Sequence, residues 1–371
     1  MSAQVFTGAT VFDGTRLLPG ATLRVEDGRV TDPGPGEVVR LDGGILAPGF
    51  LDLQVNGGGG RMVDGFATAD RLAEMCGIHA RLGATGILPT LITDAPEATA
   101  RVIAAGIEAT RRQVPGFLGL HLEGPHLDPR RKGAHDPALI RPMGEDDLNR
   151  LLEAAAALPT LMVTLAPESA TPDQIGRLAA AGVIVSLGHT DCGHATASQA
   201  MAAGASCVTH LFNAMSQLGN REPGLVGAAL TGPVHAGLIA DGIHVSPDTI
   251  RIAMAASDRL FLVSDAMAAA GSDLTEFTLN GRRILRRNGS LRLEDGTLAG
   301  ADLTLVRAVT VMTGLGTSLE TALAMASSRP ARCVGRDDTL GHLLPGRSAD
   351  MVHLAGNGSL SAVWRDGRLL A

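Results

Sequence analysis

The 371-residue chain has almost no lysine, very few aromatic side chains and only four cysteines. It contains no tyrosine and one tryptophan, which disfavours the stacking platforms of single-stranded nucleic-acid binders and aromatic sugar clefts. The net charge of -7, without basic clusters, disfavours nucleic acids and membrane surfaces as partners. The cysteines are scattered without a CxxC pair, which argues against a disulfide framework and against a thiolate metal site.

Missing motifs exclude further classes of enzyme. Lys132 is the only lysine, so Schiff-base chemistry would have to use it. The phosphate loop GxxxxGK[ST], the dinucleotide fingerprint GxGxxG and the hydrolase elbow GxSxG are all absent. The first residues lack the pattern of a signal peptide, and no apolar run reaches the ~18 residues of a membrane span. We therefore expect a cytoplasmic protein with no membrane or nucleic-acid partner.

The middle of the chain alternates between short apolar runs and helical patterns. Several of these helical patterns end at a glycine, as left-handed helix caps do: Gly83, Gly182 and Gly204. Roughly eight strand–helix units favour an α/β fold with a closed (β/α)8 TIM-type barrel. A doubly wound open sheet is the alternative. It is disfavoured because polar residues follow the strands of most units.

Both ends of the chain differ from the middle. Residues 1–48 and 336–371 read as short strands separated by Asp-Gly and Pro-Gly turns. We expect the two ends to form one small β-sandwich domain beside a catalytic barrel over residues 49–335. Two Asn-Gly pairs and one Asp-Gly pair predict a β-hairpin insertion near residues 276–300.

Residues able to do chemistry follow the apolar runs repeatedly. In a barrel the carboxyl ends of the strands converge on the face that carries the active site. This convergence is the main functional signal of the sequence. The residues are Gln54, Asn56, His121, Glu123, His189, Thr209, His210, Asp241, His244 and Asp265.

Glu123, His189 and His210 each close a different predicted strand. One carboxylate and two imidazoles make a zinc-type catalytic set that leaves positions open for water. Any one of them alone reads better as a hydrogen-bonding loop residue, but three at equivalent positions favour a ligand set. Asp265, after another strand, can take a proton from water and return it to a leaving nitrogen, with a helix N-cap as the alternative.

A second metal is not expected. Two-metal barrel hydrolases usually carry an HxH pair on the first strand and often a modified lysine. Here that strand offers Gln54 and Asn56, which are weak ligands, and Lys132 lies in a loop. The same loop carries His135, our candidate for polarising a carbonyl oxygen, although a surface histidine is the plainer interpretation of that residue alone.

An anion site is plausible elsewhere on the same face. Arg221 and His244 could bind an anion together with backbone amides near Asn213 and Ala214. Asp241 precedes His244 and is added to these substrate candidates. Because the chain has 30 arginines, most of them are expected to be solvated surface charges.

Eight short motifs follow one another along the chain: APGFLDLQVNG, HLEGPH, KGAH, SLGHT, THLFNAM, ADGIHV, VSDAM and GTLAG. In this order and spacing the chain resembles N-acetylglucosamine-6-phosphate deacetylases of the amidohydrolase superfamily, essentially over residues 1–371. The resemblance implies hydrolysis of the acetamide of N-acetyl-D-glucosamine 6-phosphate to D-glucosamine 6-phosphate and acetate. It also implies one divalent metal ion per subunit, with zinc ahead of iron, manganese, cobalt and cadmium, and a homodimer.

Transferred motif by motif, the resemblance implies that Glu123, His189 and His210 bind the metal and that Asp265 is the proton-transferring residue. Gln54 and Asn56 match a single-metal branch of the family, as possible vestiges of a second metal position. The substrate contacts implied are Ala134, His135, Asn213, Ala214, Arg221, His244, Leu298, Ala299 and Gly300.

One residue departs from the family pattern. His126 follows HLEGP, where the family usually carries Phe or Tyr. The departure leaves the chemistry unchanged but concerns the shape of that loop and the sugar preference.

Three other functions compete with this interpretation. A dihydroorotase-like or hydantoinase-like cyclic amidase would need the missing HxH pair and the bridging lysine. A deacetylase of N-acetylgalactosamine 6-phosphate is harder to separate, because the two substrates are epimers at one hydroxyl. A catalytically inactive sugar-phosphate sensor is opposed by the intact ligand set together with Asp265.

Overall fold

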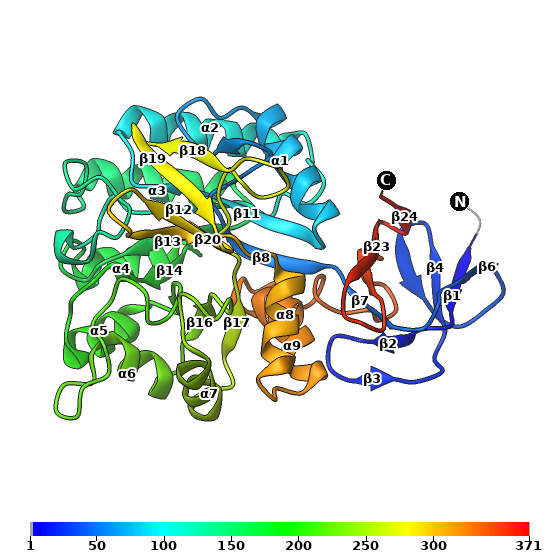
Figure 1. Cartoon of the computed structure of the whole chain (residues 1–371). Coiled ribbons are helices and arrows are strands. Elements are labelled where there is room, and N and C mark those ends of the chain that lie inside the picture. The colour runs from blue at the N-terminus through cyan, green and yellow to red at the C-terminus, as the bar shows by residue number, and fades with distance from the viewer. Residues whose placement is uncertain (1–2, 371) are drawn as a thin grey trace.

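The computed structural model describes residues 3–370, and its centre is an eight-stranded parallel barrel (Figure 1). Each strand pairs with the next along the chain, in the order β17-β16-β15-β14-β13-β12-β11-β8. A parallel bridge between Val55 and Ala266 brings the two ends of this sheet together. The predicted barrel is confirmed. Its strands are β8 (Phe50–Val55), β11 (Ala84–Ile92), β12 (Leu120–Glu123), β13 (Leu161–Leu165), β14 (Ile184–Leu187), β15 (Cys207–Val208), β16 (His235–Leu238) and β17 (Leu260–Leu262).

Helices cover the outside of the barrel. All nine residues of β11 are buried, as expected of a parallel strand covered on both faces. Gly83, Gly182 and Gly204 have positive φ and follow α1, α4 and α5, which confirms the predicted helix ends. None of the described helices is long and apolar enough to cross a bilayer. The helices are α1 (Ala69–Arg81), α2 (Pro96–Arg111), α3 (Glu145–Ala157), α4 (Pro172–Ala180), α5 (His194–Ala203), α6 (Gly224–Thr231), α7 (Pro247–Ala256), α8 (Leu305–Gly314), α9 (Leu319–Ala326) and α10 (Ser328–Cys333).

The two chain ends lie side by side, away from the barrel mouth (Figure 1). One six-stranded sheet, in the order β24-β23-β22-β7-β2-β3, combines strands from both ends, and a four-stranded sheet, β5-β4-β1-β6, comes from the N-terminal end. Phe6 and Trp364 meet edge to face at 5.3 Å in their shared core. The strands are β1 (Gln4–Thr7), β2 (Thr10–Phe12), β3 (Leu17–Leu18), β4 (Leu23–Glu26), β5 (Arg29–Thr31), β6 (Glu37–Arg40), β7 (Ile45–Pro48), β22 (Met351–Leu354), β23 (Leu360–Arg365) and β24 (Arg368–Leu369).

A separate antiparallel sheet follows the eighth barrel strand and lies across the barrel (Figure 1). The turn pattern predicts a hairpin here, whereas the structure has a four-stranded meander. Asn280 and Asn288 have positive φ, each followed by a positive-φ glycine, as tight two-residue hairpin turns require. The third turn, at Asp295-Gly296, adds the last strand. The strands are β18 (Glu276–Leu279), β19 (Arg282–Arg287), β20 (Ser290–Leu293) and β21 (Leu298–Ala301).

Candidate active site

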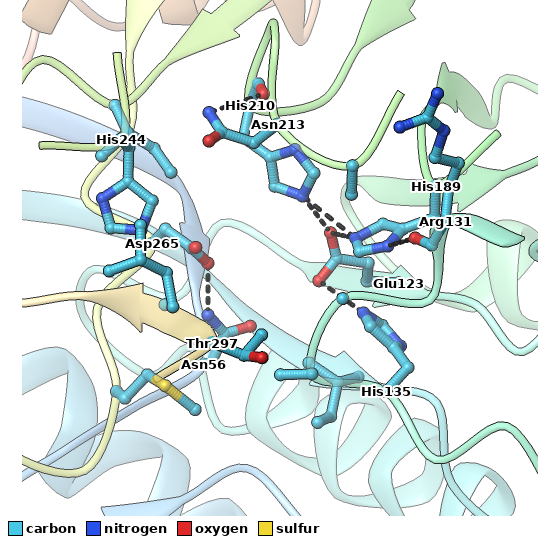
Figure 2. A pocket seen from close by; sticks show the side chains of 18 of the residues that line it. Asn56, Glu123, Arg131, His135, His189, His210, Asn213, His244, Asp265 and Thr297 are labelled. Atoms are coloured by element: carbon cyan, nitrogen blue, oxygen red, sulfur yellow. Dashed lines mark hydrogen bonds and ion pairs between the residues drawn. The ribbon is translucent and has the colours of Figure 1, made fainter. Parts of the chain in front are cut away.

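Glu123, His189 and His210 come together at the carboxyl ends of three barrel strands, β12, β14 and β15 (Figure 2). Glu123 is the last residue of β12, and the two histidines follow β14 and β15 by two residues. Their ligand atoms all lie within 4.8 Å of one another, and all three residues are buried. This is the juxtaposition that the sequence predicts, and its donor set is one that can hold a metal ion.

The contacts among these side chains fit a cation between them. Oε1 of Glu123 lies 3.1 Å from Nε2 of His210 and 3.3 Å from Nε2 of His189, and the two Nε2 atoms are 3.1 Å apart. Burial would raise the pKa of Glu123, but hydrogen bonds from the imidazoles of His135 and His210 help to hold it well below its usual range. An ionised carboxylate facing two imidazole nitrogens is a common ligand set for a divalent metal.

Asp265 lies just beyond β17 and faces the ligand set across the pocket (Figure 2). Its backbone is in the left-handed region, with φ of 50°, and Nδ2 of Asn56 donates to its Oδ1 at 2.6 Å. Burial, and then the charge of Glu123, raise the pKa of Asp265 to about 6. A carboxylate with a pKa near neutrality is suited to accept a proton and return it.

Asp52 is buried in β8, and its hydrogen bonds join the first barrel strand to the segment after the last one. Its Oδ1 accepts the backbone N–H of Ser264 at 3.2 Å and that of Gln54 at 3.3 Å. Burial raises the pKa of Asp52 from 3.8 to about 7. The folded chain therefore holds a proton on Asp52 that the unfolded chain releases at lower pH. Its contribution to stability is present below pH 3.8 and is lost as the pH rises through about 7.

We expect Asp52→Asn to remove this titration. Measured on metal-free protein, the stability of the variant relative to wild type should rise by about 2–3 kcal/mol between pH 5 and pH 8, since only the wild type loses the contribution. Urea unfolding of both proteins at the two pH values gives the difference. A difference that does not change with pH would contradict the assignment.

His135 reaches the same pocket from the loop after β12. Its Nδ1 accepts the backbone N–H of Thr93 at 3.3 Å and lies 2.8 Å from the Thr93 hydroxyl. Burial, and then the charge of His189, lower the pKa of His135 to about 4. The ring is therefore neutral, with its proton on Nε2. That nitrogen lies 3.6 Å from Oε2 of Glu123 and can donate to a carbonyl oxygen held nearby.

These side chains line one pocket of about 340 Å³. One wall is apolar and comes from Ile92, Met267, Leu279 and Leu298, in part from the meander. Of the other sequence-predicted residues, the pocket brings in Asn56, Ala134, Asn213, Ala214, His244 and Gly300.

Other predicted residues do not reach the lining. Gln54 lies behind it and donates from Nε2 to Oε1 of Glu123 at 3.0 Å, and Asp241 accepts from Nδ1 of His244 at 2.6 Å. Ala299 is buried in the core of the meander, and Arg221 is exposed on the loop after β15. Their substrate roles stay predictions.

The structure also adds pocket residues that the sequence reasoning missed. Arg130, Arg131 and Gly133 line the pocket, as does Thr297. The one sequence signal for the two arginines is that they directly precede KGAH. His126 is buried away from the pocket lining, with Nδ1 3.1 Å from the carbonyl oxygen of Arg141. The departure at His126 therefore concerns loop packing.

Residues 45–370 match the model of the amidohydrolase family, and the chain belongs to this family. An N-acetylgalactosamine-6-phosphate deacetylase of Shewanella sp. (strain ANA-3) is 43% identical, over 89% of this chain and 84% of its own. The N-acetylglucosamine-6-phosphate deacetylase structure from Pasteurella multocida is 32% identical with a TM-score of 0.95, covering 100% of both chains. A mutant of the Mycobacterium smegmatis deacetylase, in complex with N-acetyl-D-glucosamine-6-phosphate, is 32% identical with a TM-score of 0.93 and covers 100% of both chains.

Proposed function

We propose that the protein hydrolyses the acetamide of N-acetyl-D-glucosamine 6-phosphate to D-glucosamine 6-phosphate and acetate. The observation that carries the proposal is the buried set of Glu123, His189 and His210 in one pocket with Asp265 and His135. The similar solved structures are deacetylases of this substrate. The family match supports a metal-dependent hydrolase, and the absence of an HxH pair at Gln54 and Asn56 supports a single metal.

Glu123, His189 and His210 would hold one divalent cation, with zinc as the first choice for this ligand set. A cation bound there supplies Lewis acidity, which lowers the pKa of water and polarises a carbonyl group. Gln54 supports the set by donating to Glu123 while its own amide oxygen accepts from Thr209 at 2.8 Å. These hydrogen bonds fix the orientation of the Glu123 carboxylate.

Asp265 carries out both proton transfers, and His135 stabilises the charge that develops on the carbonyl oxygen. Asp265 accepts the proton of the attacking water, and Nε2–H of His135 donates to the carbonyl oxygen as negative charge develops on it. Asp265 then protonates the departing nitrogen, which frees the amino sugar. Asn56 keeps Asp265 aimed into the pocket through its 2.6 Å hydrogen bond.

The sugar phosphate would lie toward His244, Asn213 and Ala214, and Arg221, on an exposed loop, is the proposed cationic partner of the phosphate. We expect Arg221→Ala to raise KM about tenfold with little change in kcat, because a charge-assisted hydrogen bond to phosphate is lost. Steady-state kinetics of acetate release measure both constants, with Arg368→Ala in the terminal sheet as control. Unchanged kinetics would make Arg221 an ordinary surface charge.

N-acetylgalactosamine 6-phosphate is the second candidate substrate. The observation in its favour is the 43% identical Shewanella relative, which is a deacetylase of that epimer. Acetate release from both epimers, with and without their phosphate and with and without chelator, separates the possibilities. Faster acetate release from the glucosamine epimer supports the proposal. Faster release from the galactosamine epimer would make N-acetylgalactosamine 6-phosphate the preferred substrate. No release from either would refute the deacetylase assignment.

We further propose a cytoplasmic homodimer. The support is the resemblance to the deacetylase family and the four cysteines, which are all buried and free of disulfides. Light scattering of the purified protein tests the assembly state, and a monomeric mass would contradict it.

A further inference from the structure

The backbone of His189 is held in a conformation that is uncommon for residues other than glycine. Its φ of 47° lies in the left-handed region, which is disfavoured for residues with a Cβ. His189 follows β14 and aims Nε2 at Glu123. Neighbouring contacts must therefore hold both the strained backbone and the ring in place.

Those contacts come from the short turn after β12, the 3-10 helix Pro129–Arg131. The N–H of Asp128 donates to the carbonyl oxygen of His189 at 2.9 Å. The carbonyl oxygen of Arg131 lies 2.9 Å from Nδ1 of His189, so that Nδ1 carries the proton (Figure 2). Because a neutral imidazole has one N–H, this bond leaves a lone pair on Nε2 to face a cation.

The same turn passes directly across the ring. Gly133 has φ of 54°, and a Cβ built there would lie 3.3 Å from Cε1 of His189. Only a residue without a side chain fits this approach comfortably. The position of the turn and the orientation of the ring are therefore coupled.

One carboxylate ties the turn to the strand end that carries His189. Asp191 accepts from Nε of Arg131 at 2.7 Å and from Arg130 at 3.2 Å. Its own N–H donates to Glu168, which lies three residues beyond β13 and also accepts from the Thr190 hydroxyl at 2.5 Å. Three neighbouring loops thus meet at Asp191, just outside the pocket.

The ion pairs of Asp191 with Arg130 and Arg131 are partly exposed to solvent, so their effect on protein stability is expected to be small. The side chains of Arg131 and Asp191 are 38% and 30% exposed, and Arg130 is 61% exposed. Ion pairs this open to solvent contribute little to the free energy of unfolding. We expect them to affect mainly the orientation of the His189 imidazole.

We propose that Asp191 is a positioning residue for the metal site: through Arg131 it holds the carbonyl that fixes the Nδ1–H tautomer of His189. The inference rests on the metal site of the proposed function. Without the Asp191–Arg131 pair the turn can move, and His189 can carry its proton on Nε2. In that tautomer the ring faces His210 and Glu123 with a hydrogen and cannot bind a cation.

The test compares Asp191→Asn with Asp70→Asn, which removes a comparable exposed pair with Arg112 (2.7 Å) far from the pocket. Competition of each metal-free protein with a chromophoric chelator for zinc measures affinity. We expect Asp191→Asn to weaken zinc binding by about 10- to 100-fold, the range found for residues that support ligands, and Asp70→Asn to leave it unchanged. The thermal midpoints of the metal-free variants should stay near that of the wild type.

Nitrogen chemical shifts of His189 give a readout that a general loss of stability would not move. We expect the Asp191→Asn spectrum to show mixed tautomers in the metal-free protein, and Asp191→Glu to restore the Nδ1–H form. Wild-type zinc affinity in Asp191→Asn would overturn the proposal. Weakened zinc binding together with a lower thermal midpoint and an unchanged His189 tautomer would overturn it as well, because the loss would then come from stability. Because these measurements use no substrate, they hold or fail independently of acetate release.

Discussion

Replacing Asp265 with asparagine is expected to lower kcat about 10³-fold and to leave zinc affinity nearly unchanged, because positioned acid–base catalysis contributes about 10²- to 10⁴-fold. Asparagine keeps the size and the polar contacts of Asp265 but can neither accept nor return a proton. Since Asp265 is not one of the ligand residues, the metal site should survive the change. Single-turnover acetate release and chelator competition measure the two quantities separately.

The dependence of kcat/KM on pH tests the role of Asp265 in a second way. Burial and the charge of Glu123 raise the pKa of Asp265 to about 6, so wild-type kcat/KM should fall as the pH drops through that range and the base becomes protonated. The Asp265→Asn variant should lack this acid limb. Asp273→Asn, an exposed change on the following loop, serves as the control. Turnover near the wild-type value in Asp265→Asn would remove Asp265 from the mechanism.

The second large effect is expected from His210→Ala. Removing one of three ligands leaves two donors, and we expect the variant to retain no zinc after dialysis against a weak chelator. Acetate release should fall at least about 10³-fold, since Lewis-acid stabilisation contributes several kcal/mol to such reactions. Elemental analysis and the acetate assay measure both losses.

The loss should follow from the ligand and not from unfolding. The buried His210 side chain contacts Glu123 and His189, so a smaller side chain enlarges the pocket at the barrel mouth while the strands keep their pairing. Circular dichroism should therefore match the wild type. His194→Ala, at the start of α5, is the matched control and should retain metal and activity. A His210→Ala protein with stoichiometric zinc and full turnover would show that the ligand set is wrong.

The barrel was predictable because its local signals agree with one another. Buried runs such as β11 are mostly apolar, and glycines such as Gly83 and Gly204 adopt the positive φ that ends the preceding helix. The strand-end positions of Glu123, His189 and His210 could be read from the sequence, since parallel strands bring their carboxyl ends to one face. Most of the fold was therefore predictable because the hydrophobic pattern and the turn residues indicate the same elements.

Contacts between distant segments could not be read in the same way. The sequence places Gln54 and Asp241 beside the pocket, but only the folded loops show that they lie behind Glu123 and His244 as hydrogen-bond partners. Arg130 and Arg131 read as two more arginines among thirty, because their role depends on Asp191, 60 residues further on. The Asp295-Gly296 pair predicts a turn, but it does not show that a fourth strand, β21, pairs with β20 beyond it.

The central claim is that one cation, held by Glu123, His189 and His210, supports hydrolysis of an N-acetyl amino-sugar phosphate. A zinc titration of metal-free protein, followed by acetate release from N-acetyl-D-glucosamine 6-phosphate, tests it most directly. We predict negligible release without metal and a linear rise that reaches its plateau at one zinc per chain. Full release from rigorously metal-free protein, or a plateau only at two zinc ions per chain, would contradict the account.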